Sequence, residues 1–164
     1  MPAVDPAGFP TAWQIGRGVV SVLVPPAVIG IVGGGQLGRM LAQVAQRRGY
    51  RTAVLTGGGE GTPAGAVADI EIDAPFGDAG AVQRLVACAD VITWELEDVD
   101  LGVADAAADA GVPVRPRPQV MATAADRALE KRALTDAGVP VAPYREATGP
   151  SELAAALGAL HGPV

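Results

Sequence analysis

The stretch that most constrains the fold runs from Val28 to Gly38 and reads V-I-G-I-V-G-G-G-Q-L-G. Its first five residues are apolar and mostly β-branched, which favours a buried strand. Gly33, Gly35 and Gly38 then stand at G-x-G-x-x-G spacing before a helical pattern. Glycines let the chain turn sharply, and the first amides of a helix can hold a phosphate or a carboxylate. The stretch predicts a strand–turn–helix unit with an anion site; a purely structural turn is the alternative.

A helix is predicted directly after this turn, over residues 36–49. Its apolar positions recur at steps of three and four, which is the helical period: Leu37, Met40, Leu41, Val44 and Ala45. Its polar positions are Arg39, Gln43, Arg47 and Arg48. We expect the apolar face to pack on the sheet, the polar face to meet solvent, and Gly49 to end the helix.

Strands and helices alternate along the rest of the first 118 residues. Strands are predicted over 52–55, 67–72, 91–94 and 112–114, and helices over 79–87 and 101–110. This alternation is typical of an α/β fold with an open, mostly parallel, Rossmann-like sheet. A glycine-rich loop, residues 57–65, separates the second and third strands, and we assign it no role.

Composition divides the chain into three segments. Residues 1–27 contain five prolines, so we expect a disordered extension there, or a start codon placed too early. Residues 28–118 form the first domain and end in a proline-rich stretch. Residues 119–164 are interpreted as the truncated beginning of another domain, with helices over 119–137 and 151–160, an extended piece over 141–144, and Ser151 as N-cap.

Charge and residue usage exclude several functions. A net charge of −6 disfavours a non-specific nucleic-acid binder. The apolar run over 18–32 is interrupted by prolines and is short for a bilayer, so no membrane partner is expected. The single cysteine, Cys88, excludes an internal disulfide and fits the cytoplasm. One histidine, His161, and no cysteine cluster leave a zinc site without ligands.

Binding of NAD(P) is the first function that the glycine spacing suggests. A dinucleotide fold places an acidic residue about 20 positions further on, at the end of the second strand, where it binds the ribose. That place holds Leu55, Thr56 and Gly57, and the nearest carboxylate, Glu60, lies inside the glycine-rich loop. The dehydrogenase interpretation is therefore disfavoured.

Several segments, in order, resemble the 5-(carboxyamino)imidazole ribonucleotide synthases, which are ATP-grasp ligases of purine biosynthesis. These segments read GGGQLGRM (33–40), ADVITWELEDV (89–99), GVPVRPRP (111–118), and DR, EK and AGVPVAP within 126–143. The resemblance extends from Val28 to the C-terminus. It implies a pre-ATP-grasp domain with a Rossmann-like sheet, which binds the ribonucleotide, followed by the start of an ATP-grasp domain. The family carboxylates aminoimidazole ribonucleotide with ATP and bicarbonate through carboxyphosphate.

The resemblance also implies roles for particular residues. Gly35, Gln36, Leu37 and Glu95 would bind the ribonucleotide, and Arg127 would reach the ATP phosphates. Simpler alternatives stay open, with Glu95 as a solvated strand end and Arg127 as a surface cation. The catalytic residues are unknown from this sequence.

The sequence departs from the family pattern in places. Thr56 and Gly57 replace the usual aspartate and proline, and Trp94 replaces a tyrosine. The ATP-binding lysine, the acidic magnesium ligands and the bicarbonate site would lie beyond Val164. We therefore predict an N-terminal part that is inactive alone, whereas the full-length enzyme would use ATP and Mg and could be a homodimer. A relative of formate-dependent glycinamide ribonucleotide transformylase and a non-catalytic nucleotide-binding module are the alternatives.

Overall fold

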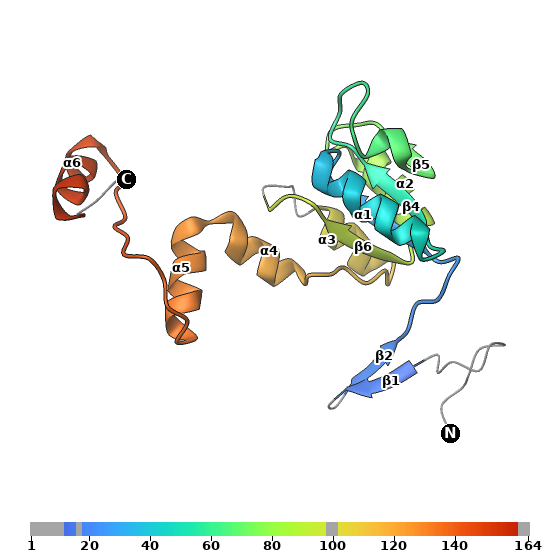
Figure 1. Ribbon diagram of the computed structural model, residues 1–164, viewed down its shortest axis with the longest axis horizontal. Helices are drawn as coiled ribbons and strands as arrows, with labels where there is room; N and C mark the ends of the chain where they lie inside the picture. Colours follow the sequence, from blue (N-terminus) through green and yellow to red (C-terminus); the bar gives the residue numbers. More distant parts are fainter. Residues whose placement is uncertain (1–11, 16–17, 98–101, 161–164) are drawn as a thin grey trace. The chain divides into compact units, whose positions relative to one another are not determined.

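Four parallel strands form the central sheet of the first unit, residues 1–118, in the order β5-β4-β3-β6 (Figure 1). The computed structural model describes residues 12–15, 18–97 and 102–160. The strands are β3 (Val28–Val32), β4 (Arg51–Leu55), β5 (Ile70–Ile72) and β6 (Val91–Trp94). Val32 pairs with both Leu55 and Trp94, so β3, β4 and β6 end level at one edge. The predicted open parallel α/β sheet is confirmed.

Helices cover both faces of this sheet. They are α1 (Gln36–Arg47), the 3-10 helix η1 (Gly65–Val67), α2 (Ala79–Cys88) and α3 (Gly102–Asp109). On one face, Ile31 packs in a buried cluster with Ala42 of α1. Gly30, the preceding residue, faces α2, since a Cβ there would lie 3.3 Å from Leu85. Successive strand residues point to opposite faces, so α1 and α2 lie on opposite sides of the sheet.

The helix α1 forms where it was predicted, but the expected orientation of its faces is wrong. Its buried residues are the small ones, Gly38, Ala42 and Ala45. The large apolar side chains are exposed to between 43% and 56%: Leu37, Met40, Leu41 and Val44. Small residues let the helix backbone approach the sheet closely, and this close approach leaves the large side chains outside.

Two of the predicted strands are shorter than expected. Of the strand predicted over 67–72, only β5 forms. Before β5 the backbone pairing with β4 stops, because the Thr52 amide donates its hydrogen bond to the Asp69 side chain instead of a backbone carbonyl. The strand predicted over 112–114 is reduced to one bridge between Val114 and Ile92. Pro113 has no amide hydrogen to extend that pairing.

Two short antiparallel strands precede the sheet, β1 (Ala12–Ile15) and β2 (Gly18–Ser21). Both strands lie within residues 1–27, and neighbouring β-branched residues favour their pairing. Further along, the Tyr50 hydroxyl donates a hydrogen bond to the Leu23 carbonyl at 2.9 Å.

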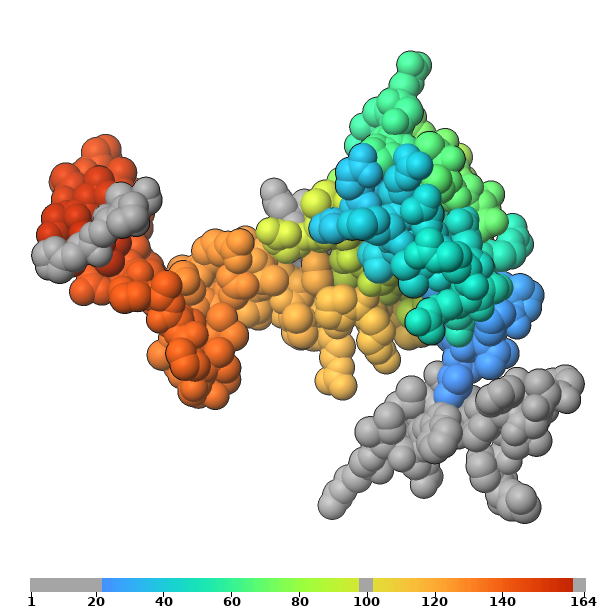
Figure 2. Space-filling view, viewed as in Figure 1, coloured from blue at the N-terminus to red at the C-terminus, as the bar shows by residue number. Residues whose placement is uncertain are grey.

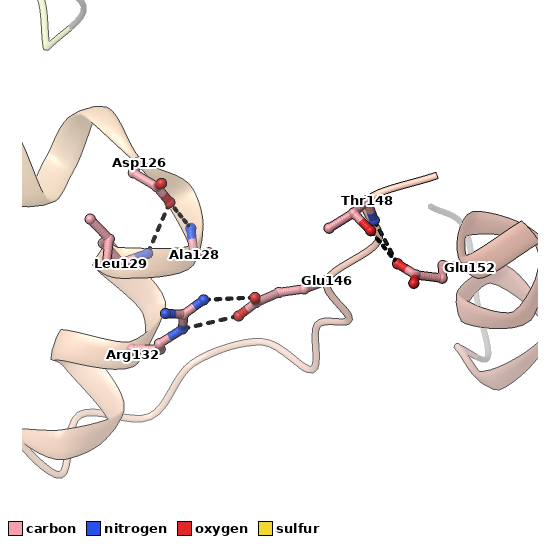
Figure 3. A network of polar contacts seen from close by, with 7 residues as sticks. All are labelled: Asp126, Ala128, Leu129, Arg132, Glu146, Thr148 and Glu152. Atoms are coloured by element: carbon pink, nitrogen blue, oxygen red, sulfur yellow. Dashed lines mark hydrogen bonds and ion pairs between the residues drawn. The ribbon is translucent and has the colours of Figure 1, made fainter. Parts of the chain in front are cut away.

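The second unit, residues 119–164, contains most of α4 (Pro118–Ala125) and all of α5 (Arg127–Asp136) and α6 (Pro150–Ala159). The single helix predicted over 119–137 is wrong, since the Asp126 carboxylate accepts hydrogen bonds from the amides of Leu129 and Ala128 and starts a new helix (Figure 3). Those two bonds lower the pKa of Asp126. None of the helices in the described part of the chain is long and apolar enough to cross a bilayer.

The N-cap of α6 also differs from the prediction. Gly149, not Ser151, caps the helix, and Pro150 follows it in the first turn, where its missing amide hydrogen costs nothing. Glu152 accepts hydrogen bonds from the amide and the hydroxyl of Thr148, both at 2.8 Å, which lower its pKa (Figure 3).

A network around Asp69 ties α1 to the sheet. Its carboxylate accepts hydrogen bonds from the amide of Thr52 at 2.8 Å and from the Gln46 side chain at 3.2 Å. Gln46 also donates to the Val67 carbonyl at 2.7 Å. Burial opposes ionisation of Asp69, but these hydrogen bonds outweigh it, and its pKa lies below the usual value.

Replacing Asp69 by alanine is expected to lower the free energy of unfolding by about 1–2 kcal/mol near neutral pH, because the buried Thr52 amide loses its acceptor. The folded-state pKa is depressed, so this contribution is present above the unfolded pKa of about 3.9 and is lost as the pH falls through the folded value. Urea unfolding at several pH values measures it. Asp109→Ala, in the last turn of α3, is the control; an equal loss there, or a difference that does not shrink in acid, would contradict the assignment.

The second unit has little core of its own. Among the described residues of its helices, only Met121 is buried. Six large apolar side chains are exposed: Val120, Leu129, Leu134, Val139, Leu153 and Leu157. Short helices without tertiary packing are marginal in water.

We therefore expect the amides of α5 and α6 to exchange with deuterium much faster than those of β3 and β4, whose side chains are largely buried. Exchange followed by mass spectrometry tests this in the intact chain. Comparable protection in α5 and β3 would show that the second unit is stabilised by something other than its own packing.

Candidate functional site

The site lies where the strand order reverses. β3 has β4 on one side and β6 on the other, and the three strands end together. In open parallel sheets, ligands bind outside the carboxyl ends of the strands at such a switch point. The residues that follow β3 and β6 are the glycine turn and Glu95.

Glu95 closes the start of α1. Its amide donates to the Val32 carbonyl at 2.8 Å, which holds it to the end of β3. Its carboxylate accepts a hydrogen bond from the Gly35 amide, also at 2.8 Å. Gly35 is the N-cap of α1 and has no side chain to cap the helix. Because a helix N-terminus carries partial positive charge, the Glu95 carboxylate is the anion that the turn holds.

The glycines leave room for this carboxylate. Gly33 has a φ of 134°, which favours glycine, and a Cβ at Gly33 or Gly35 would overlap Glu95. A Cβ at Gly38 would lie 2.6 Å from the Gly33 carbonyl oxygen and 2.9 Å from the Glu95 carboxylate. The three glycines of the motif are therefore required by one close approach of turn, helix and carboxylate.

A cavity of about 420 Å³ opens beside Glu95. Its lining residues are Leu37, Met40, Leu41, Val44, Trp94 and Glu95. One half-buried carboxylate thus stands at the end of an apolar wall. Sequence reasoning missed this wall, because it assigned the apolar positions of α1 to the core.

The predicted site residues of the first unit come together. The Gly35 amide donates a hydrogen bond to Glu95, and Leu37 lines the same cavity as Glu95. Gln36, between Gly35 and Leu37 in the sequence, is exposed in the first turn of α1. Glu97 is exposed, as expected for loop surface, and Asp98 lies outside the described residues. Glu95 is partly buried and hydrogen-bonded, so it is not a freely solvated strand end.

The geometry argues against a dinucleotide. Thr56 follows β4 and is buried, and its hydroxyl donates to the Asp73 carboxylate at 2.9 Å. In the glycine-rich loop, the Gly59 amide donates to the same carboxylate at 3.0 Å. The place of a pyrophosphate, at the start of α1, is occupied by Glu95, which would repel it.

Arg127 belongs to the second unit. It pairs with Glu130 at 2.6 Å and lines a cavity of about 400 Å³ with Lys131, Tyr144 and Arg145, among others. Lys131 lies over the Tyr144 ring, 5.6 Å from its centroid. Arg132 beside this cavity makes a two-pronged ion pair with Glu146 at 2.7 and 3.1 Å, which raises its pKa (Figure 3). The cations around the cavity suit a phosphate chain.

Within the described ranges, no three carboxylate, imidazole or thiol side chains gather as a metal would need.

A family model described as the ribonucleotide synthetase pre-ATP-grasp domain matches residues 27–125, more than half of the chain. The chain belongs to this family. The matched residues include the sheet, the glycine turn and Glu95 of the pre-ATP-grasp domain.

Relatives of the pre-ATP-grasp domain carry consistent names. The N5-carboxyaminoimidazole ribonucleotide synthase of Brucella melitensis is 44% identical over 140 residues, which are 85% of this chain and 38% of that protein. The ADP complex of an N5-carboxyaminoimidazole ribonucleotide synthetase superposes with a TM-score of 0.76 at 37% identity, over 87% of this chain and 37% of the other. The Aspergillus clavatus synthase, in complex with ADP and 5-aminoimidazole ribonucleotide, gives 0.66 at 30%, over 82% and 36%. The chain thus spans well under half the length of these relatives.

The tight contact of the glycine turn gives a direct test. Gly38→Ala in the pre-ATP-grasp domain is expected to lower the free energy of unfolding by about 2–4 kcal/mol, because its Cβ displaces the Gly33 carbonyl and the Glu95 carboxylate. Gly80→Ala is the control: it lies in α2, its Cβ would meet only Asp78 at 3.4 Å, and it should be neutral or stabilise by up to about 1 kcal/mol. Chemical denaturation measures both. Equal effects would contradict the close approach.

Proposed function

We propose that this chain is the ribonucleotide-binding part of an ATP-dependent ligase that carboxylates aminoimidazole ribonucleotide with bicarbonate in purine biosynthesis. The observation that carries the proposal is the Glu95 carboxylate, held by the Gly35 amide at the switch point of the sheet. The names of the relatives support the proposed activity, and the ribonucleotide bound in the Aspergillus clavatus complex supports the choice of aminoimidazole ribonucleotide as the ligand.

The site favours the sugar end of the ribonucleotide. One oxygen of Glu95 accepts the hydrogen bond of Gly35, and the carboxylate keeps further lone pairs for ribose hydroxyl donors. Gln36 would add a side-chain amide from the first helical turn, and Leu37 would pack against the apolar part of the ligand. Because Glu95 already neutralises the start of α1, the phosphate group would be bound elsewhere in the enzyme.

In the second unit, we propose that Arg127 contributes to binding the ATP phosphates. Its cavity also carries Lys131 and Arg145, so three cationic side chains surround one space. The described residues offer no group that fits Mg, so no step is assigned to a metal in this chain.

In the proposed enzyme, bicarbonate attacks the γ-phosphorus of ATP and gives carboxyphosphate and ADP. The amine of the ribonucleotide then forms the new C–N bond, and phosphate leaves. The first step needs cations positioned around the transferring phosphoryl group; in the second, the carboxyl group is transferred, the C–O bond to phosphate breaks and the amine loses a proton. We expect this chain by itself to release no phosphate from ATP, and we expect the whole enzyme to act in the cytoplasm.

Calorimetric titration of the chain with aminoimidazole ribonucleotide tests the proposal. We expect binding that Glu95→Gln weakens by at least about tenfold, since a charged acceptor is replaced by a neutral amide. Glu97→Gln is the matched control, because Glu97 is exposed two residues further on, and it should bind as the unaltered chain does. Equal affinity of both variants for the ribonucleotide would show that Glu95 does not contribute to binding.

The same titration separates the alternatives. Tighter binding of glycinamide ribonucleotide would favour the transformylase relative. If the folded chain binds neither ribonucleotide, the interpretation as a non-catalytic module is the alternative that remains. The names of the relatives favour the carboxylating enzyme.

A further inference from the structure

The cations around the cavity of the second unit differ in how their charges are neutralised. Arg127 pairs with Glu130 at 2.6 Å, and Arg132 beside the cavity binds both oxygens of Glu146. Lys131 lines the same cavity of about 400 Å³, and none of the described carboxylates forms an ion pair with it. An anion that enters the cavity must therefore compete with a carboxylate at Arg127, but not at Lys131.

An aromatic ring holds the ammonium group of Lys131. Its Nζ lies 5.6 Å from the centroid of the Tyr144 ring, inside the roughly 6 Å at which a ring face attracts a cation. Both side chains are half-buried. An ammonium group has three hydrogen-bond donors, and the ring lies on only one side of it, so donors remain for the oxygens of a phosphate group.

The ion pair of Arg132 with Glu146 brings the ring and the ammonium group together. It joins α5 to the extended segment that follows this helix, across 14 residues of sequence (Figure 3). Tyr144 lies two residues before Glu146, and Lys131 directly precedes Arg132. Arg127 stands one helical turn before Lys131, so both lie on the same side of α5. Figure 2 shows α5 and the segment after it, in orange, at the surface of their unit.

We infer that Lys131 is the residue that contacts the phosphate chain in this cavity, and that Tyr144 is its positioning residue. The inference rests on the proposed function only for the identity of the anion, ATP. The ring holds the ammonium group in place before the anion arrives, so less side-chain entropy is lost on binding. Arg145 adds positive charge to the cavity, but its Nη1 already donates to the Tyr144 carbonyl at 2.9 Å.

Titration of the intact chain with inorganic triphosphate at low ionic strength, followed by NMR of the α5 backbone amides, tests the inference. Lys131→Gln should weaken binding by at least about fivefold, because the phosphate loses a charged donor. Arg84→Gln is the matched control, since it removes the same charge from an exposed position on α2, and it should change the affinity by less than about twofold. Equal weakening by both variants, or no binding of triphosphate by the unaltered chain, would overturn the inference.

Variants of Tyr144 test the positioning role. Tyr144→Phe keeps the ring face and should retain the affinity for triphosphate within about twofold, whereas Tyr144→Leu should lower it by about two- to fivefold. Combined with Lys131→Gln, Tyr144→Leu should have no further effect, which a general loss of structure would not reproduce. An equal loss in Tyr144→Phe and Tyr144→Leu, or an undiminished effect of Tyr144→Leu in the absence of Lys131, would contradict the role of the ring.

Triphosphate and ribonucleotide report on different units. Glu95 lies in the first unit and Lys131 in the second, so each ligand can be titrated separately into the same chain. The ribonucleotide result decides the proposed function, and the triphosphate result decides the role of Lys131.

Discussion

The hydrogen bond from the Gly35 amide to the Glu95 carboxylate links the parts on which the site depends. It joins two segments that are 60 residues apart in sequence and brings the ends of β3 and β6 to one point. It also supplies the missing cap of α1, since Gly35 has no side-chain oxygen. The absence of side chains at Gly33 and Gly35 allows the carboxylate to enter. One interaction therefore fixes the turn, the helix start and the acidic group of the proposed site.

The close approach of α1 to the sheet determines which side chains of the helix remain exposed. Ala42 and Ala45 pack where larger side chains would push the helix away from the sheet. Leu37 and Val44 are then left at the surface, beside the cavity that Glu95 shares. The apolar wall beside Glu95 is therefore a consequence of the small residues on the buried face of α1.

Much of this could be predicted from the sequence, and the misses have physical reasons. Local patterns located β3 and α1, and the glycine spacing together with the resemblance singled out Glu95. The Gly35–Glu95 contact depends on which strands are neighbours, and periodicity does not give strand order. Periodicity groups Leu37 with Val44 but does not say whether that group faces the core. The break at Asp126 had a readable signal, because aspartate is a strong N-cap.

A helix start that already holds a carboxylate of its own protein selects its ligands differently from an empty one. An empty start attracts any small anion, and phosphate compounds would compete for it. With Glu95 in place, the local charge is balanced, and a free phosphate gains nothing by binding there. What remains is an acceptor for hydroxyl groups beside an apolar wall. In the proposed function, the glycine turn and Glu95 would therefore bind sugar hydroxyl groups in preference to small anions.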